Sequence, residues 1–293
     1  MEAAIRKADV LVEAMSWIRE FRGQTVVIKL GGSVMKNHTA LEHILSDIVF
    51  METVGMHPVV VHGGGAAISS AMDAAGIEAK FIQGRRYTDR ASLAIVEEVL
   101  VRNINHDLVE RVNDLHGKAA AVNFTSHNVL RGQKLNLVTA NGEDIDLGFV
   151  GEVTEVDHAH LRQLCDRKTV PFIPSMCEGI DNPETKFNVN ADTAATAVAI
   201  SLQADKLVFL SDVNGVRLDK DDPSSLINSL DSTRARQLIT NGTIASGMIP
   251  KVESCLDTLE AGVGKVHIID GRLKHSLLLE VYTDSGIGTE IVP

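Results

Sequence analysis

The chain has 293 residues, of which 44% are hydrophobic and 23% charged, enough for one large globular domain or two joined lobes. Its net charge of −11, with no long lysine- or arginine-rich run, argues against a nucleic-acid partner. No apolar segment resembles a membrane span or a signal peptide, and three isolated cysteines form no metal-binding pattern. We therefore expect a cytoplasmic protein without a membrane partner or a protein-held metal ion.

Apolar residues in the segment 2–22 recur at helical spacing, which predicts an amphipathic helix. The apolar stripe consists of Ile5, Ala8, Leu11, Val12, Met15 and Ile18. Such a helix can pack on its own chain or pair with the same helix of a second subunit. The periodicity leaves both arrangements open.

Continuous apolar runs further along the chain predict buried strands, because parallel strands covered on both faces do not alternate. These runs are 25–30, 58–62, 118–124, 170–174, 206–210 and 265–270. Helical patterns separate most of them, at about 39–55, 65–75, 90–115, 191–203 and 248–261. The alternation predicts an α/β fold of βαβ units with both halves on one sheet. Segment 128–156 has period-2 stretches around Asn141-Gly142, which predict antiparallel strands.

Two glycine turns follow the first two predicted strands. Lys29-Leu-Gly-Gly-Ser33 would bring backbone N–H groups and an ammonium group to one anion, although a tight turn with an exposed lysine has the same sequence. His62-Gly-Gly-Gly65 allows close backbone approach and supplies N–H donors at a helix start. Neither turn matches the dinucleotide fingerprint or the Walker loop.

Three later segments add polar groups after predicted strands or at helix starts. Phe187-Asn-Val-Asn-Ala-Asp192 opens a helix, where Asn190 alone would suffice as the N-cap. Leu210-Ser-Asp-Val-Asn-Gly215 follows a strand, and Ser246-Gly-Met-Ile-Pro-Lys251 places a lysine just inside a helix start, where the helix dipole disfavours it. Two lysines, several N–H clusters and one aspartate, without a Ser/His/Asp set, favour phosphoryl transfer.

The chain resembles the amino-acid-kinase family in five motifs, from about residue 10 to its end. The motifs are Lys29-Leu-Gly-Gly, Val61-His-Gly-Gly-Gly65, Asn188-Val-Asn-Ala-Asp192, Ser211-Asp-Val-Asn-Gly215 and Gly247-Met-Ile-Pro-Lys251. Their order and spacing resemble the kinases of N-acetyl-L-glutamate. The resemblance implies an open αβα sandwich with a mostly parallel central sheet, preceded by the N-terminal helix. It also implies ATP-dependent phosphorylation of the side-chain carboxylate of N-acetyl-L-glutamate to N-acetyl-L-glutamyl 5-phosphate, the second step of arginine biosynthesis.

The same resemblance implies a division of the chain. Residues 1–22 would form an oligomerisation helix and residues 23–293 the kinase domain. Within that domain, about 23–185 would be the substrate lobe and about 186–293 the nucleotide lobe.

Site residues follow from the matching motif positions. Lys29 and Lys251 would neutralise charge on the transferred phosphoryl group, and Asp192 would hold both lysines. Gly32 and Gly64 would donate backbone N–H bonds to its oxygens. The substrate site would comprise Gly64, Gly65, Arg86 and Asn188, with Arg85 as an alternative to Arg86. The ATP site would comprise Ser211, Asp212, Val213, Gly215 and Lys251, with Mg²⁺ carried on the ATP phosphates.

A further resemblance, to the arginine-inhibited branch, concerns regulation. In that branch the leading helix joins three dimers into a hexamer, and L-arginine binds beside it. Trp17, Glu280 and Gly286 would then form the arginine site, with Glu280 meeting the guanidinium group. The alternative is a dimer whose N-terminal helix packs locally.

Departures from the family pattern leave other functions open. Ala66-Ala67 stands where the family usually has proline and an acidic residue, and 117–135 fits the family poorly. Another carboxylate or carbamate kinase of the family is one alternative. A catalytically silent arginine-sensing protein is another, although such a sensor would not need Lys29, Asp192 and Lys251 together.

Overall fold

The computed structural model describes residues 1–138, 142, 144–219, 221–244, 248–282 and 286–293. The α-helices are α1 Glu2–Phe21, α2 Gly32–Met35, α3 His38–Thr53, α4 Gly65–Ala74, α5 Arg90–Glu97, α6 Asn105–Asp114, α7 His158–Asp166, α8 Ala191–Leu202, α9 Ser232–Thr240, α10 Ile249–Glu260 and α11 Ser276–Val281. A π-helix, η1 Glu98–Ile104, joins α5 to α6, and η2 Pro223–Ser225 is a 3-10 turn.

The central sheet has eight strands in the order β14-β16-β15-β13-β1-β2-β10-β5. Their bounds are β1 Thr25–Leu30, β2 His57–His62, β5 Ala119–Ala121, β10 Val170–Pro174, β13 Lys206–Ser211, β14 Ser229–Asp231, β15 Lys265–Asp270 and β16 Thr289–Val292. All neighbouring pairs are parallel except β15 with β16. The predicted α/β fold with a mostly parallel sheet is confirmed, and strands from both halves of the chain share that sheet.

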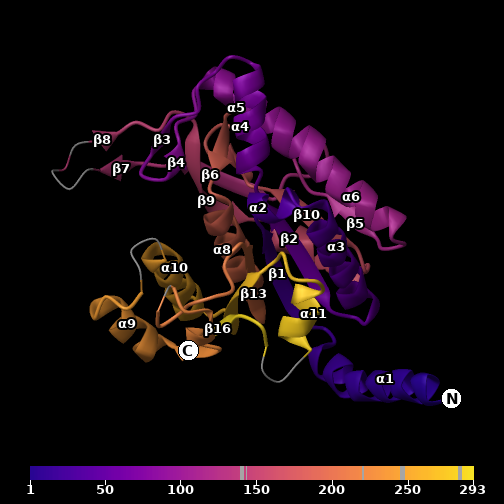
Figure 1. The fold of residues 1–293 in the computed structure, drawn as a ribbon. Helices are drawn as coiled ribbons and strands as arrows, with labels where there is room; N and C mark the ends of the chain where they lie inside the picture. Colours follow the sequence, from indigo (N-terminus) through magenta and orange to yellow (C-terminus); the bar gives the residue numbers. More distant parts are fainter. Residues whose placement is uncertain (139–141, 143, 220, 245–247, 283–285) are drawn as a thin grey trace.

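Helices cover both faces of this sheet (Figure 1). On one face α3, α6 and α11 close a core that includes Val26, Ile28 and Leu30 of β1. On the other face α7, α8 and α10 close a core that includes Val27. Because side chains alternate along a strand, β1 is apolar on both faces, which explains its continuous apolar sequence.

The predicted antiparallel region forms a separate group of strands. Four of them, β6 Leu130–Lys134, β9 Val150–Val156, β11 Met176–Gly179 and β12 Lys186–Val189, close into a small barrel. Two short hairpins, β3 Phe81–Ile82 with β4 Arg85–Arg86 and β7 Leu137–Val138 with β8 Asp144–Ile145, complete the set. Asn141, the first residue of the predicted turn, lies outside the described residues, whereas Gly142 has the positive φ of 81° that such a turn requires.

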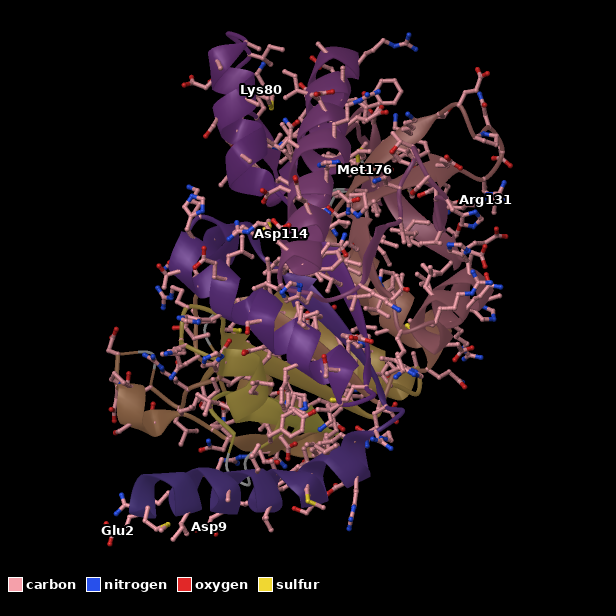
Figure 2. The ribbon with its side chains drawn as sticks, turned by 90° about the vertical axis from the view of Figure 1, so that its right-hand side faces the viewer. Glu2, Asp9, Lys80, Asp114, Arg131 and Met176 are labelled. Atoms are coloured by element: carbon pink, nitrogen blue, oxygen red, sulfur yellow. The ribbon has the colours of Figure 1, made fainter. Side chains whose placement is uncertain are left out.

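Helix α1 projects from one end of the molecule (Figure 1). Figure 2 shows it lying across that end, with Glu2 and Asp9 toward its free end. Its last turns pack on the chain, where Phe21 is buried and meets Tyr282 edge-on at 5.7 Å. The stripe residues Ile5 and Val12 are exposed, so local packing does not account for them. Within the described residues, no helix has the length and apolar character of a membrane span.

Candidate active site

The carboxyl ends of the parallel strands meet at one edge of the sheet, where the predicted motifs begin. In the sheet, β1 lies between β2, which follows it in sequence, and β13 from the second half of the chain. The order of the strands reverses at this point, and ligands of open α/β sheets bind outside the carboxyl ends at such a point. Both glycine turns and the segment after Ser211 therefore surround one crevice.

Lys29, Asp192 and Lys251 meet in this crevice. Lys29 Nζ lies 2.9 Å from Asp192 Oδ1, and Lys251 Nζ lies 3.2 Å from Asp192 Oδ2. Strand alternation places Lys29 on the same face of β1 as Val27, which is the face covered by α8. Asp192 is the second residue of α8, and its backbone N–H donates to the N-cap side chain of Asn190. Asn190 thus has the predicted capping role.

Electrostatics keep the Asp192 carboxylate ionised. Burial raises its pKa, but the ammonium groups of Lys29 and Lys251 outweigh that effect, so the pKa lies below its ordinary value. Lys251 Nζ also lies 5.0 Å from the ring centroid of Phe209. Two positive charges on one negative charge leave the cluster with a net positive charge. Such a cluster suits an anion.

A cavity of about 210 Å³, which we call the Lys29 cavity, opens beside this cluster. Of the predicted residues, Lys29, Gly32, Gly64, Gly65, Arg86 and Asn188 line it, together with Arg85. The two glycine turns face each other there: a Cβ atom on Gly32 would lie 3.5 Å from Gly65 N. The cavity also includes Ser175 and Phe81, which the sequence motifs did not indicate.

Arg86 is buried and held on several sides. Its Nη2 donates to Gly65 O at 2.9 Å and to Ser69 Oγ at 2.8 Å, and its guanidinium lies 4.7 Å from the Phe81 ring centroid. Burial lowers its pKa. Arg85 is less buried and lines the same cavity, so both arginines lie within reach of a bound acid.

Asn188 lines the Lys29 cavity and is linked by hydrogen bonds to the segment that carries Arg86. Its Nδ2 donates to Thr88 Oγ1 at 3.2 Å, and Thr88 Oγ1 donates in turn to Arg86 O at 2.9 Å. Asn188 stands near the end of β12, so the small barrel supplies it rather than the central sheet. Thr88 is a contact that the sequence motifs did not predict.

A second cavity of about 360 Å³, which we call the Asp212 cavity, lies beyond β13. Of the residues predicted for the ATP site, Asp212, Val213 and Gly215 line it, whereas Ser211 and Lys251 are not among its lining residues. Met248 of the last motif also lines it, together with four apolar and basic residues that lie outside the motifs: Arg217, Ile244, Arg272 and Leu273. Gly247, the first residue of the last motif, lies outside the described residues.

Arg272 could have been found from the sequence, because it follows strand β15 as the glycine turns follow β1 and β2. Its guanidinium makes two bonds to the Asp270 carboxylate, at 2.9 and 2.8 Å, and donates to Asp212 O at 2.7 Å. This fork ties the ends of β13 and β15 together at the cavity.

The predicted arginine-site residues surround a third cavity, of about 750 Å³, which we call the Trp17 cavity. Trp17, Glu280 and Gly286 line it. The Glu280 carboxylate has partners within the chain: its Oε1 lies 2.7 Å from His267 Nδ1, and its Oε2 accepts from the backbone N–H of Ile287. Burial raises the pKa of Glu280, but these partners outweigh it and lower the pKa overall. The other acids of this cavity are Glu20, Asp205 and Glu290.

Comparison with known proteins agrees with this geometry. A sequence model of the amino acid kinase family matches residues 24–270. Acetylglutamate kinases from Heliobacterium modesticaldum and Methanothrix thermoacetophila are each 44% identical, over 100% of both chains in the first case and over 98% of this chain and 99% of the relative in the second.

Among solved structures, N-acetylglutamate synthase from Neisseria gonorrhoeae, complexed with coenzyme A and N-acetyl-glutamate, superposes with a TM-score of 0.81 at 27% identity. The match covers 97% of this chain but only 62% of the synthase. Carbamate kinase from Giardia, at 16% identity and a TM-score of 0.65, shares the fold. The full-length kinase relatives and the family match together show that the chain belongs to the amino acid kinase family, in its acetylglutamate kinase branch.

Proposed function

We propose that the chain transfers the γ-phosphoryl group of ATP to the side-chain carboxylate of N-acetyl-L-glutamate, the second step of arginine biosynthesis. The observation that carries the proposal is the Asp192 carboxylate held between the Lys29 and Lys251 ammonium groups. Phosphoryl transfer needs positioning and charge neutralisation more than covalent chemistry. The full-length acetylglutamate kinase relatives support the choice of substrate.

In this reaction the two ammonium groups neutralise the charge that develops on the transferred group. Asp192 keeps them at a fixed separation without taking part in bond making. The attacking oxygen belongs to the carboxylate of the substrate, which is ionised near pH 7, so the protein needs no general base. Backbone N–H groups of Gly32 and Gly64 stabilise the phosphoryl oxygens.

The acyl substrate occupies the Lys29 cavity, where Arg86 binds its α-carboxylate in a planar fork and Asn188 binds its amide. Gly65 allows the substrate to approach the backbone. The hydrogen bonds that Arg86 already makes to Gly65 and Ser69 hold its guanidinium in place for the acid.

ATP occupies the Asp212 cavity, with Ser211, Asp212, Val213 and Gly215 around the nucleotide and Lys251 at its γ-phosphate. Met248 lines that cavity three residues before Lys251 on the same segment. No group of three acidic, histidine or cysteine side chains in the described part of the chain could cage a metal ion. Asp192, the acid at the cluster, is already bound to two ammonium groups. Mg²⁺ enters on the phosphates of ATP, whose oxygens are the ligands that this ion prefers.

The proposal keeps the division into an oligomerisation helix at 1–22, a substrate lobe at about 23–185 and a nucleotide lobe at about 186–293. L-arginine binds in the Trp17 cavity and inhibits the enzyme, which forms a hexamer through α1 and works in the cytoplasm. The exposed apolar stripe of α1 and the acidic side chains of that cavity support this regulatory part.

A coupled ADP-release assay with a panel of acids tests the catalytic part. We expect turnover with N-acetyl-L-glutamate and little with L-glutamate, L-aspartate or carbamate.

Lys251→Ala should keep its fold and lose about 10²–10³-fold in kcat, because one charge-stabilising group is gone. Lys118→Ala, an exposed lysine at the amino end of β5, is the matched control and should keep full activity. Turnover of another acid in place of N-acetyl-L-glutamate, or a fully active Lys251→Ala, would overturn the proposal.

A further inference from the structure

Three buried polar side chains lie in a row beneath the second glycine turn, and the proposed reaction uses none of them. They are His62, Asn105 and Asn123, which are 0%, 0% and 2% exposed. Burying polar groups costs free energy unless each is hydrogen-bonded. The partners of these groups therefore show what the row does.

Backbone groups fix the orientation of both amides. The Thr125 N–H, which can only donate, lies 2.8 Å from Asn123 Oδ1, so Asn123 Nδ2 is the atom that donates to Asn105 Oδ1 at 2.7 Å. Phe172 O, which can only accept, lies 2.9 Å from Asn105 Nδ2. The two constraints give Asn105 the same orientation independently.

This orientation determines the protonation of His62. Asn105 Nδ2 lies 2.9 Å from His62 Nε2, so Nε2 accepts a hydrogen bond and carries no proton. Complete burial lowers the pKa of His62 to about 4, so the ring is neutral at physiological pH. Its single proton is then on Nδ1, which lies 3.2 Å from Gly63 O and donates to it.

The Gly63 carbonyl belongs to the same peptide unit as the Gly64 N–H. No peptide bond among the described residues is cis, and in a trans peptide the C=O and N–H point in opposite directions. With the carbonyl turned to His62, the Gly64 N–H points away from the ring, and Gly64 is a lining residue of the Lys29 cavity. This N–H has no acceptor among the described residues.

The other side of Gly64 is held by the π-helix. A Cβ atom on Gly64 would lie 2.6 Å from both Leu100 Cδ2 and Ile104 Cδ1 of η1. Asn105 is the residue that directly follows η1. The π-helix thus supplies the surface under Gly64, and the residue directly after it supplies the amide that fixes His62. Such π-helical segments are frequent at functional sites.

We infer that His62 is a positioning residue, whose Nδ1–H holds the Gly63 carbonyl and thereby aims the Gly64 N–H at the transferred phosphoryl group. The inference rests on the proposed function for the identity of that group. In this view His62, Asn105 and Asn123 orient a backbone group for catalysis in addition to stabilising the fold. His62 touches neither substrate, and it acts only through the peptide that follows it.

Two substitutions separate these roles, because each keeps one of the two histidine contacts. An asparagine nitrogen is as many bonds from Cβ as Nδ1, so His62→Asn keeps a donor for Gly63 O and loses the partner of Asn105. A glutamine oxygen is as many bonds from Cβ as Nε2, so His62→Gln keeps an acceptor for Asn105 and loses the donor to Gly63.

We expect His62→Gln to lose at least about tenfold in kcat, with the KM for each substrate changed by less than about twofold, since the donor acts in the transition state. His62→Asn should keep kcat within about threefold although its Tm falls further, because it leaves space and an unpaired group in the core. The inference is wrong if the variant with the lower Tm also has the lower kcat, or if His62→Gln is fully active. The three buried side chains would then serve stability only.

Nitrogen-15 NMR of labelled histidine gives a test that does not depend on turnover, and His62→Asn identifies the signal. We expect the wild-type His62 ring to show a protonated Nδ1 and an unprotonated Nε2 at pH 7, without titration above about pH 5. A proton on Nε2 would overturn the inference even in an active enzyme. If the protein has the expected tautomer but no kinase activity, the proposed function is wrong, whereas the contact between His62 and Gly63 O is established.

Discussion

At the scale of single residues, the charged cluster shows how alternation along a strand selects a functional side chain. Lys29 interrupts an apolar strand, and its position two residues after Val27 turns it to the face covered by α8. Its register partner on β13 is Phe209, whose ring lies under the Lys251 ammonium. The strand and both lysines could be predicted from the sequence. The separation of the ammonium groups could not, because a long-range contact between α8 and α10 sets it.

Asp192 makes folding stability depend on pH in a predictable direction. Its pKa is lowered on folding, so its contribution is present above the ordinary value of 3.8 and is lost as pH falls through the lower folded value. Asp192→Asn should lower stability by about 1–3 kcal/mol at pH 7, because it leaves two ammonium groups without their shared carboxylate. Thermal unfolding from pH 7 to pH 3 measures the difference.

We expect the wild-type and Asp192→Asn curves to converge as pH falls below 3.8, since the protonated acid and the amide are then equivalent in charge. Asp181→Asn, at an exposed position, serves as the control and should follow the wild type throughout. A constant difference between wild type and Asp192→Asn at all pH values would show that charge at Asp192 does not stabilise the fold.

Glu280 and Arg272 mark what sequence reasoning missed at this scale. The family resemblance paired Glu280 with the guanidinium group of L-arginine, but it did not reveal the contact with His267 of β15 or the backbone donors of the turn that follows α11. Nothing local in the tail indicates this partner. Arg272, in contrast, follows a predicted strand directly, so the rule that found the glycine turns also applied to it.

At the scale of elements, strands that are apolar on both faces were predictable almost to the residue. β1, β10 and β15 have the predicted bounds. β5 ends at Ala121 rather than at the predicted residue 124, because Asn123 accepts from the Thr125 N–H and turns the chain. The helical segment 90–115 has the predicted extent but contains η1. Helical periodicity cannot reveal a π-helix that packing beneath a glycine turn stabilises.

Gly64 and Gly65, two of the three glycines of the second turn, should respond differently to substitution. A Cβ atom on Gly64 would collide with Leu100 and Ile104, so Gly64→Ala should lower Tm by several degrees and kcat by at least about tenfold. Gly65 has nothing within 4 Å of the added atom, so Gly65→Ala should keep its Tm and raise the KM for the acyl substrate by narrowing the Lys29 cavity. Differential scanning calorimetry and steady-state kinetics measure both effects.

The comparison of these two variants has an internal control, since they differ by one position and add the same methyl group. If Gly64→Ala lowers Tm no more than Gly65→Ala does, then η1 has moved to make room for the added methyl group. An unchanged KM in Gly65→Ala would place the acyl substrate away from this turn.

At the scale of the whole molecule, the topology explains why one sheet serves two ligands. The strand order reverses at β1, so the Lys29 cavity lies outside β1 and β2, while the Asp212 cavity lies outside β13 and β15. Asp192 and its two lysines stand where these regions meet. The small barrel, which supplies Asn188, was visible in the sequence only as alternating segments, because its closure depends on the pairing of β11 with β6.

Helix α1 presents two different faces over its length. Trp17 and Phe21 stack at 5.7 Å, and both pack toward the body of the chain. At 3.6 residues per turn, the stripe through Val12 and Met15 lies on the other side of the helix, and both side chains are exposed. An apolar stripe of this kind is stabilised when the same helix of a second subunit covers it. Trp17 also lines the proposed arginine cavity, so assembly and inhibition should be coupled.

Val12→Glu tests this coupling in the full chain. A charge in a stripe covered by a second subunit costs several kcal/mol when desolvated, so we expect the proposed hexamer to dissociate to dimers. The value of kcat should stay within about twofold, because the catalytic cluster lies on another part of the chain. Inhibition by L-arginine should weaken by at least about tenfold. Analytical ultracentrifugation with and without arginine, combined with the ADP assay, measures all three quantities.

Glu13→Gln, one position along on the polar face, should leave them unchanged. A wild-type protein that sediments only as a dimer and ignores arginine would contradict the regulatory proposal while leaving the kinase proposal intact.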